Sequence, residues 1–181
     1  MSLPSSSLLT RLLGAGLLLL TVLGACASPY APDRSLVRAE NAPAEIAIMA
    51  VEDRSSGAWA PKEELRSALV AAALDAGFTP LSRQFVDKAK IDRDVPALGD
   101  AGVLHLRILN WVDGGGEASS LHVHYHLTLH HNGELLADVL QARVLAADAT
   151  AQSLGSDARI QYIVAQLAAE MMGELPPPPA L

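Results

Sequence analysis

Cys26 is the residue whose chemical role the sequence indicates most directly. It is the only cysteine in the 181-residue chain, and it follows the two small residues Gly24 and Ala25. Small side chains at these positions let a signal peptidase close on the backbone, and the cysteine thiol can then accept a diacylglycerol. The sequence therefore predicts a lipobox, with residues 1–25 as the signal peptide and Cys26 as the lipidated first residue, carrying acyl chains such as palmitate.

The apolar run before this cysteine has two other interpretations, a buried helix and a transmembrane anchor. It extends over residues 12–23 and is preceded by Arg11. A run of this length is too short to span a bilayer, which needs about 20 apolar residues. We therefore favour a signal peptide. The residue after the cysteine is Ala27, whereas an aspartate at this position would resemble a signal for retention in the inner membrane. We therefore expect a lipid anchor in the outer membrane and a domain that faces the periplasm.

A second chemical feature is the gathering of all six histidines between residues 105 and 131. In the segment 121–131, strand alternation places His122, His124 and His126 on one face and directs the apolar residues between them to the core. We assume that this strand pairs antiparallel with the one before it, with 112 opposite 121. His105, His126 and His130 then become neighbours, and Trp111 lies beside His122.

Imidazole is a common ligand for zinc, copper and nickel, so this hairpin could bind a transition metal. The candidate ligands are His105, His122, His124, His126 and His130. Against this, side chains two residues apart on a strand lie roughly 7 Å from each other, and Arg107 in the same patch would repel a cation. The alternative interpretation is a polar sheet face without metal, and we expect no cofactor.

The sequence contains no local catalytic motif. It has neither a Gly-x-Ser-x-Gly elbow nor a His-Glu-x-x-His pair. The glycines at 114–116 lack the lysine and the strand-to-helix context of a phosphate loop. We therefore expect a protein that is not an enzyme, while a site assembled from distant residues remains an alternative.

Composition excludes several classes of partner. Removal of residues 1–25 leaves 156 residues with 12 basic and 20 acidic side chains. An acidic chain without basic clusters argues against nucleic acid and against attraction to anionic lipid. Once Cys26 is acylated no thiol remains, so neither a disulfide nor a cysteine zinc site can form. The apolar core alone must stabilise the domain.

Hydrophobic periodicity divides the mature chain into a tether, one domain and a tail. Residues 26–43 are rich in proline and predict a flexible lipid-anchored tether, residues 44–173 a single domain, and residues 174–181 an exposed proline-rich tail. Within the domain, Asn132 and Gly133 form the pair preferred in a two-residue type I′ hairpin turn. The predicted strands cover 45–52, 78–81, 102–112, 121–131 and 134–147, and the predicted helices cover 61–76, 84–90 and 156–173.

This order predicts an α/β or α+β sandwich of two or three layers. Its mixed sheet should contain about four to five strands, with an antiparallel meander at the C-terminal end and helices on one or both faces.

Several stretches together resemble a group of periplasm-facing lipoproteins with a domain like the N-terminal domain of TolB. The group includes the curli-secretion lipoprotein, the penicillin-binding-protein activator lipoprotein and uncharacterised lipoproteins. The resembling segments are 46–56, the helix at 65–69, 77–83, 100–108 and the turn at 132–134, within residues 44–172. The resemblance implies a non-catalytic, tethered accessory protein that binds another envelope component.

Three side chains are candidates for the surface that contacts such a partner, namely Trp59, Arg107 and Trp111. Exposed tryptophan next to arginine is a common composition at protein interfaces. The sequence thus predicts an outer-membrane lipoprotein that acts as an adaptor or assembly factor of the envelope. The alternative is a periplasmic metal-binding protein that uses the histidine hairpin.

Overall fold

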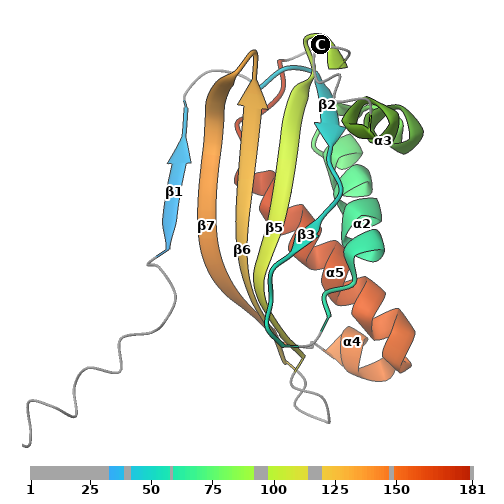
Figure 1. The fold of residues 1–181 in the computed structure, drawn as a ribbon. Helices are drawn as coiled ribbons and strands as arrows, with labels where there is room; N and C mark the ends of the chain where they lie inside the picture. The colour runs from blue at the N-terminus through green and yellow to red at the C-terminus, as the bar shows by residue number, and fades with distance from the viewer. Residues whose placement is uncertain are drawn as a thin grey trace, which may run out of the picture. The chain divides into compact units, whose positions relative to one another are not determined.

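A computed structural model shows a seven-stranded mixed sheet with helices packed against it (Figure 1). It describes residues 33–38, 42–57, 59–91, 98–113, 120–146 and 149–179, which all belong to one compact unit. The predicted signal peptide and Cys26 lie outside the described residues. The strands are β1 (Arg34–Val37), β2 (Glu45–Ile48), β3 (Glu52–Asp53), β4 (Thr79–Pro80), β5 (Gly102–Asp113), β6 (Ser120–His131) and β7 (Glu134–Ala146). The helices are α2 (Lys62–Asp75), α3 (Arg83–Ile91), α4 (Ala149–Ser153) and α5 (Ser156–Gly173).

The strand order across the sheet is β1-β7-β6-β5-β2-β4. The long strands β5, β6 and β7 form the predicted antiparallel meander, and β1 pairs antiparallel with β7. β2 and β3 pair parallel with successive parts of the same edge of β5. The α/β sandwich with a mixed sheet is therefore confirmed, with more strands than predicted because the 45–52 segment divides in two and β1 adds an edge.

The main core lies between the sheet and the pair α2 and α5. The apolar side chains of β6 face it as predicted, since Val123, Tyr125, Leu127 and Leu129 are each no more than 2% exposed. Alternate residues of β2 point the other way and pack under α3, where Ala47, Met49, Val86, Ala89 and Leu98 form a second small cluster. Helices therefore cover both faces at the β2 end of the sheet and one face elsewhere.

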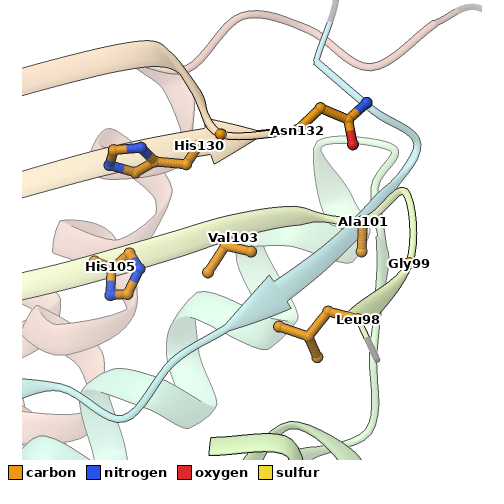
Figure 2. Close-up of a pocket in the computed structure, with 8 residues that line it drawn as sticks. Leu98, Gly99, Ala101, Val103, His105, His130 and Asn132 are labelled. Atoms are coloured by element: carbon orange, nitrogen blue, oxygen red, sulfur yellow. The ribbon is translucent and has the colours of Figure 1, made fainter. Parts of the chain in front are cut away.

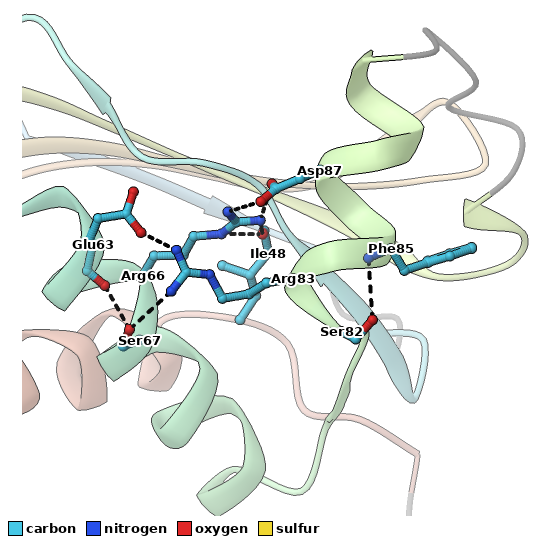
Figure 3. Close-up of polar contacts among 8 residues, drawn as sticks. All are labelled: Ile48, Glu63, Arg66, Ser67, Ser82, Arg83, Phe85 and Asp87. Atoms are coloured by element: carbon cyan, nitrogen blue, oxygen red, sulfur yellow. Dashed lines mark hydrogen bonds and ion pairs between the residues drawn. The ribbon is translucent and has the colours of Figure 1, made fainter.

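A buried arginine joins three of these elements, as Figure 3 shows. Arg66 of α2 is 2% exposed. Its Nε and Nη2 donate to the carbonyl oxygen of Ile48 at 3.1 and 2.9 Å, and its guanidinium pairs with Asp87 of α3 at 2.8 Å. Asp87 lies within the helix predicted over residues 84–90, which the structure shows as α3. The contact fixes both helices to the end of β2.

The β6–β7 turn has the predicted type I′ backbone. Asn132 and Gly133 both have positive φ, at 51° and 80°. This conformation is accessible to asparagine and glycine at little cost, which explains why this pair stands between two long strands. The turn brings the end of β6 beside the start of β7.

The β5–β6 register agrees with the assumed pairing only for the first half of β5. His105 is opposite Thr128 and Arg107 opposite His126, as predicted. A bulge between Ile108 and Asn110 then shifts the register by one residue. Because one inserted residue reverses which face each later side chain occupies, Trp111 turns into the core, where it is 5% exposed and opposite Val123. The prediction that Trp111 lies beside His122 on the outer face is therefore wrong.

Both ends of the domain differ from the prediction. Residues 34–37 of the expected tether form β1 on the edge of β7, and Ala42 is buried and donates to the carbonyl of Pro177. The expected exposed tail is in part packed on the domain, since Leu175 is buried. Apolar contacts and pairing with the edge strand therefore hold both segments on the domain, although their proline content had suggested a solvent-exposed chain. Among the described residues no helix is long and apolar enough to cross a membrane.

Candidate functional site

The outer face of β5, β6 and β7 is the part of the sheet that no described helix covers. Figure 1 views the sheet from this side, with α5 passing behind the strands. Helices α2 and α5 pack against the opposite face, and α3 packs on this side only near β2. We call this side of the three long strands the open face. Polar side chains such as His105, Arg107 and Asp138 lie on it, whereas His124 and Leu140 on the same face are buried.

Two adjoining hollows form a groove on the open face. They share His105 and His130 and have volumes of about 470 and 250 Å³. Figure 2 shows the larger hollow, in which the two histidines extend from neighbouring strands. The larger hollow is further lined by Leu98, Gly99, Ala101, Val103, Asn132 and Gly133, and the smaller by Ala50, Glu52, Leu106, Arg107, His126 and Thr128. The larger hollow is mainly apolar, and the smaller one contains the charged side chains of Glu52 and Arg107.

The two histidines at the centre of the groove lie edge to face. Their ring centroids are 6.0 Å apart and the ring planes are nearly perpendicular, at 87°. The register explains this contact, because His130 is opposite Val103 and His105 is opposite Thr128, which makes the two histidines diagonal neighbours. They give the groove a floor that can both donate and accept hydrogen bonds and can stack on a flat group.

A row of opposite charges crosses the open face beside this pair. Glu52 Oε2 accepts from Arg107 Nε at 3.3 Å on one side. On the other, the Nε2 of His126 lies 2.6 Å from Asp138 Oδ1, and Arg34 Nη2 lies 3.1 Å from the other oxygen of Asp138. The row therefore connects five strands, β3, β5, β6, β7 and β1. Each acid has a basic partner, so the surface is polar without a strong net charge.

These contacts also change the pKa values of Glu52 and Asp138. Burial acts to raise the pKa of Glu52, but the hydrogen bond and charge of Arg107, with a further contribution from Arg54, hold that pKa below its usual value. Burial likewise acts to raise the pKa of Asp138, and the hydrogen bond from His126 and the charge of Arg34 outweigh it, so this pKa is also lowered. Both acids are therefore held in the ionised form that their partners bind.

Asp138→Asn is expected to lower the free energy of unfolding by about 1 kcal/mol at pH 7 and by much less at pH 3. A carboxyl whose folded-state pKa is depressed stabilises the fold at pH values above its unfolded-state pKa, here near 3.8. That stabilisation is lost as the pH falls through the folded-state value. Urea unfolding of both proteins at the two pH values measures the difference, with Asp75→Asn at an exposed site as the control. A loss that is equal at both pH values would contradict the assignment.

The five histidines proposed as metal ligands do not form one cluster. His105, His126 and His130 line the same hollow, as predicted, and His126 also binds Asp138. His122 lies near the far end of β6, where it contacts Ser120. His124 is 3% exposed, and burial lowers its pKa. The described residues contain no group of three or more His, Cys, Asp or Glu side chains that could hold a metal ion. The zinc, copper or nickel site stays a prediction that this geometry does not favour.

The other residues that were predicted to contact a partner protein lie in different parts of the structure. Arg107 lies on the open face with its side chain 47% exposed, beside the groove. Trp59 is 84% exposed in the loop between β3 and α2, and the Nζ of Lys62 lies 5.8 Å from its ring centroid. The carboxylate of Asp53 accepts hydrogen bonds from the backbone N–H groups of Ser55 and Ala60, at 2.9 and 3.1 Å, on either side of this part of the chain. Trp59 does not line the groove.

Sequence reasoning missed Asp138 and the apolar wall of the groove. Counting back from the Asn132–Gly133 turn places Asp138 opposite Leu127, on the wrong face, because a second bulge between Leu129 and His130 shifts the pairing. Leu98 and Gly99 belong to the segment before β5 and meet the turn only in the folded chain. The alternation of β6 was the one sequence signal that located the face.

No protein-family model and no curated protein sequence matches this chain. Among solved structures, the PelC dodecamer from Paraburkholderia phytofirmans is similar with a TM-score of 0.52 and 13% identity, over 81% of this chain and 99% of that one. The lipoprotein GNA1162 from Neisseria meningitidis has a TM-score of 0.48 and 13% identity, over 72% of this chain and 99% of that one. The LpoB C-terminal domain from Salmonella enterica has a TM-score of 0.40 and 18% identity, over 61% and 86%. At such low identity the likeness to PelC concerns the fold alone.

Proposed function

We propose that this chain is a lipid-anchored protein of the bacterial outer membrane that faces the periplasm and binds another envelope component without catalysing a reaction. The observation that carries the proposal is the groove on the open face. It combines an apolar hollow, a pair of histidines and a row of paired charges on three strands that the described helices leave uncovered.

The composition of the groove suits recognition better than catalysis. Glu52 in the groove and Asp138 beside it both have basic partners and lowered pKa values, so neither is poised to exchange a proton near neutral pH. A surface that combines apolar and polar side chains is typical of a protein-binding site. The predicted lipobox at Cys26 supplies the location that we propose.

The binding surface can be tested by crosslinking in living cells. A photoreactive amino acid is placed at His105, in the groove, in the full-length chain, and in a matched variant at Ala169, which is exposed on α5. We expect a light-dependent adduct of defined mass from position 105 and none from position 169, and mass spectrometry then identifies the bound component. Adducts of equal yield from both positions, or none from position 105, would count against a binding role of the open face.

A further inference from the structure

We propose that the end of the domain that carries Trp59 rests on the bilayer, with the Trp59 indole in the interface between phospholipid headgroups and acyl chains. This inference rests on the proposed lipid anchor at Cys26. It adds an orientation and a second, non-covalent lipid contact, and it names the partner of that contact as the zwitterionic phospholipid surface.

The chain between the anchor and the folded domain is short. Asp33 is fixed to β7, since its Oδ1 accepts from the backbone N–H of Ala142 at 2.9 Å, and β1 begins at the next residue. Only residues 27–32 separate Asp33 from Cys26. A fully extended chain covers at most about 3.5 Å per residue, so the lipidated cysteine lies within roughly 25 Å of Asp33.

This reach distinguishes the two ends of the sheet. Along β7, at about 3.4 Å per residue, Ala146 lies roughly 14 Å from Ala142, whereas Glu134 beside the hairpin turn lies roughly 27 Å away in the opposite direction. β1 runs antiparallel to β7, so the chain enters β1 from the Ala146 side. A bilayer that holds Cys26 can therefore contact the Ala146 end of the sheet, while the hairpin end lies beyond easy reach.

Three of the exposed apolar side chains, Trp59, Val112 and Val144, lie toward this same end. The Trp59 loop lies beside the last residues of β5, because a side chain at Gly57 would be 3.7 Å from the carbonyl oxygen of Trp111. Val112 and Val144 are 44% and 62% exposed on the outer face, and both pair with His122, which lies between them.

The chemistry of the Trp59 loop fits a lipid interface. Tryptophan is enriched where a membrane meets water, because the indole has an apolar body and one polar N–H. The Nζ of Lys62 lies over the ring, 5.8 Å from its centroid, so the amine could reach a lipid phosphate beside the indole. The bonds to Asp53 hold the loop in shape. Because the mature chain is acidic overall, with 12 basic and 20 acidic side chains, we infer an apolar and not an electrostatic attraction.

This orientation places the groove away from the membrane. Thr128 in the groove is level with Asp138, eight residues along β7 from Ala146, which corresponds to roughly 27 Å. The groove on the open face would thus point toward the periplasm, and the contact between the Trp59 end and the bilayer would fix its distance from the membrane.

The test uses the lipidated mature protein in phosphatidylcholine vesicles with and without bromine on the acyl chains, which quenches nearby tryptophan. The chain has two tryptophans, so a Trp59→Phe variant reports Trp111 alone, which is buried in the core. We expect the brominated lipid to reduce the Trp59 emission, obtained as wild type minus variant, at least about twofold, and to leave the variant unchanged. Added phosphatidylglycerol should not alter the result.

Flotation of the same vesicles separates the two proposals. Protein that floats with the vesicles while Trp59 is not quenched would overturn the orientation and leave the anchor intact. Quenching that requires phosphatidylglycerol would overturn the apolar contact. Purified protein that carries no lipid and does not float would contradict the anchor itself, and with it the premise of this inference.

Discussion

Arg66→Met is expected to lower the free energy of unfolding by about 3 kcal/mol. The guanidinium is 2% exposed, and its loss removes two hydrogen bonds to the carbonyl of Ile48 and the pairing with Asp87. Methionine preserves most of the aliphatic volume, so the loss reports the polar contacts. A buried carbonyl left without a donor costs about 1–3 kcal/mol, and the charged contact to Asp87 adds to this.

Arg83→Met is the matched control for this prediction. Arg83 lies nearby in α3 and also pairs with an acid of α2, Glu63, but its side chain is 42% exposed (Figure 3). Exposed ion pairs contribute about 0–1 kcal/mol. Urea unfolding of both variants gives the comparison. If Arg66→Met cost no more than Arg83→Met, the guanidinium would not be the buried connection between α2, β2 and α3.

The second large effect concerns the two tryptophans. Trp111→Ala is expected to cost about 3–5 kcal/mol, because the indole is 5% exposed within the main core and its removal leaves a cavity. Trp59→Ala, at an 84% exposed position, should change the free energy of unfolding of the protein in solution by less than about 0.5 kcal/mol.

This contrast tests the bulge in β5 directly. Without the shift between Ile108 and Asn110, Trp111 would lie on the open face and its replacement would cost little. Two small and equal losses would therefore show that β5 and β6 pair without the bulge. Thermal unfolding followed by circular dichroism measures both variants under one set of conditions.

The fold was predictable where the signal is local. The alternation of 121–131 identified β6 and its core face, because a half-buried strand must alternate. The Asn132–Gly133 pair identified the turn, because few residues adopt its positive φ values. The α2 helix was also predicted to within a residue or two, because Leu65, Leu69 and Ala73 repeat at helical spacing.

The site was less predictable because it depends on pairing between distant segments. Two bulges decide which face of the sheet Trp111 and Asp138 occupy. The amino-acid composition of the strands does not indicate where these bulges occur. Arg66 has the sequence context of any surface arginine on a helix, and only the position of α3 buries it. β1 was assigned to the tether because four residues are too few to show a period, and it forms by pairing with the edge of β7.

The most direct test of the account is the fate of the chain in cells when Cys26 is replaced by serine. The wild-type protein should begin at residue 26, carry the mass of a diacylglycerol and fatty acyl modification, and fractionate with the outer membrane. The Cys26→Ser variant should lack this added mass and appear in the soluble periplasmic fraction. A variant that still fractionates with the outer membrane to the same extent as the wild type would contradict the lipid anchor.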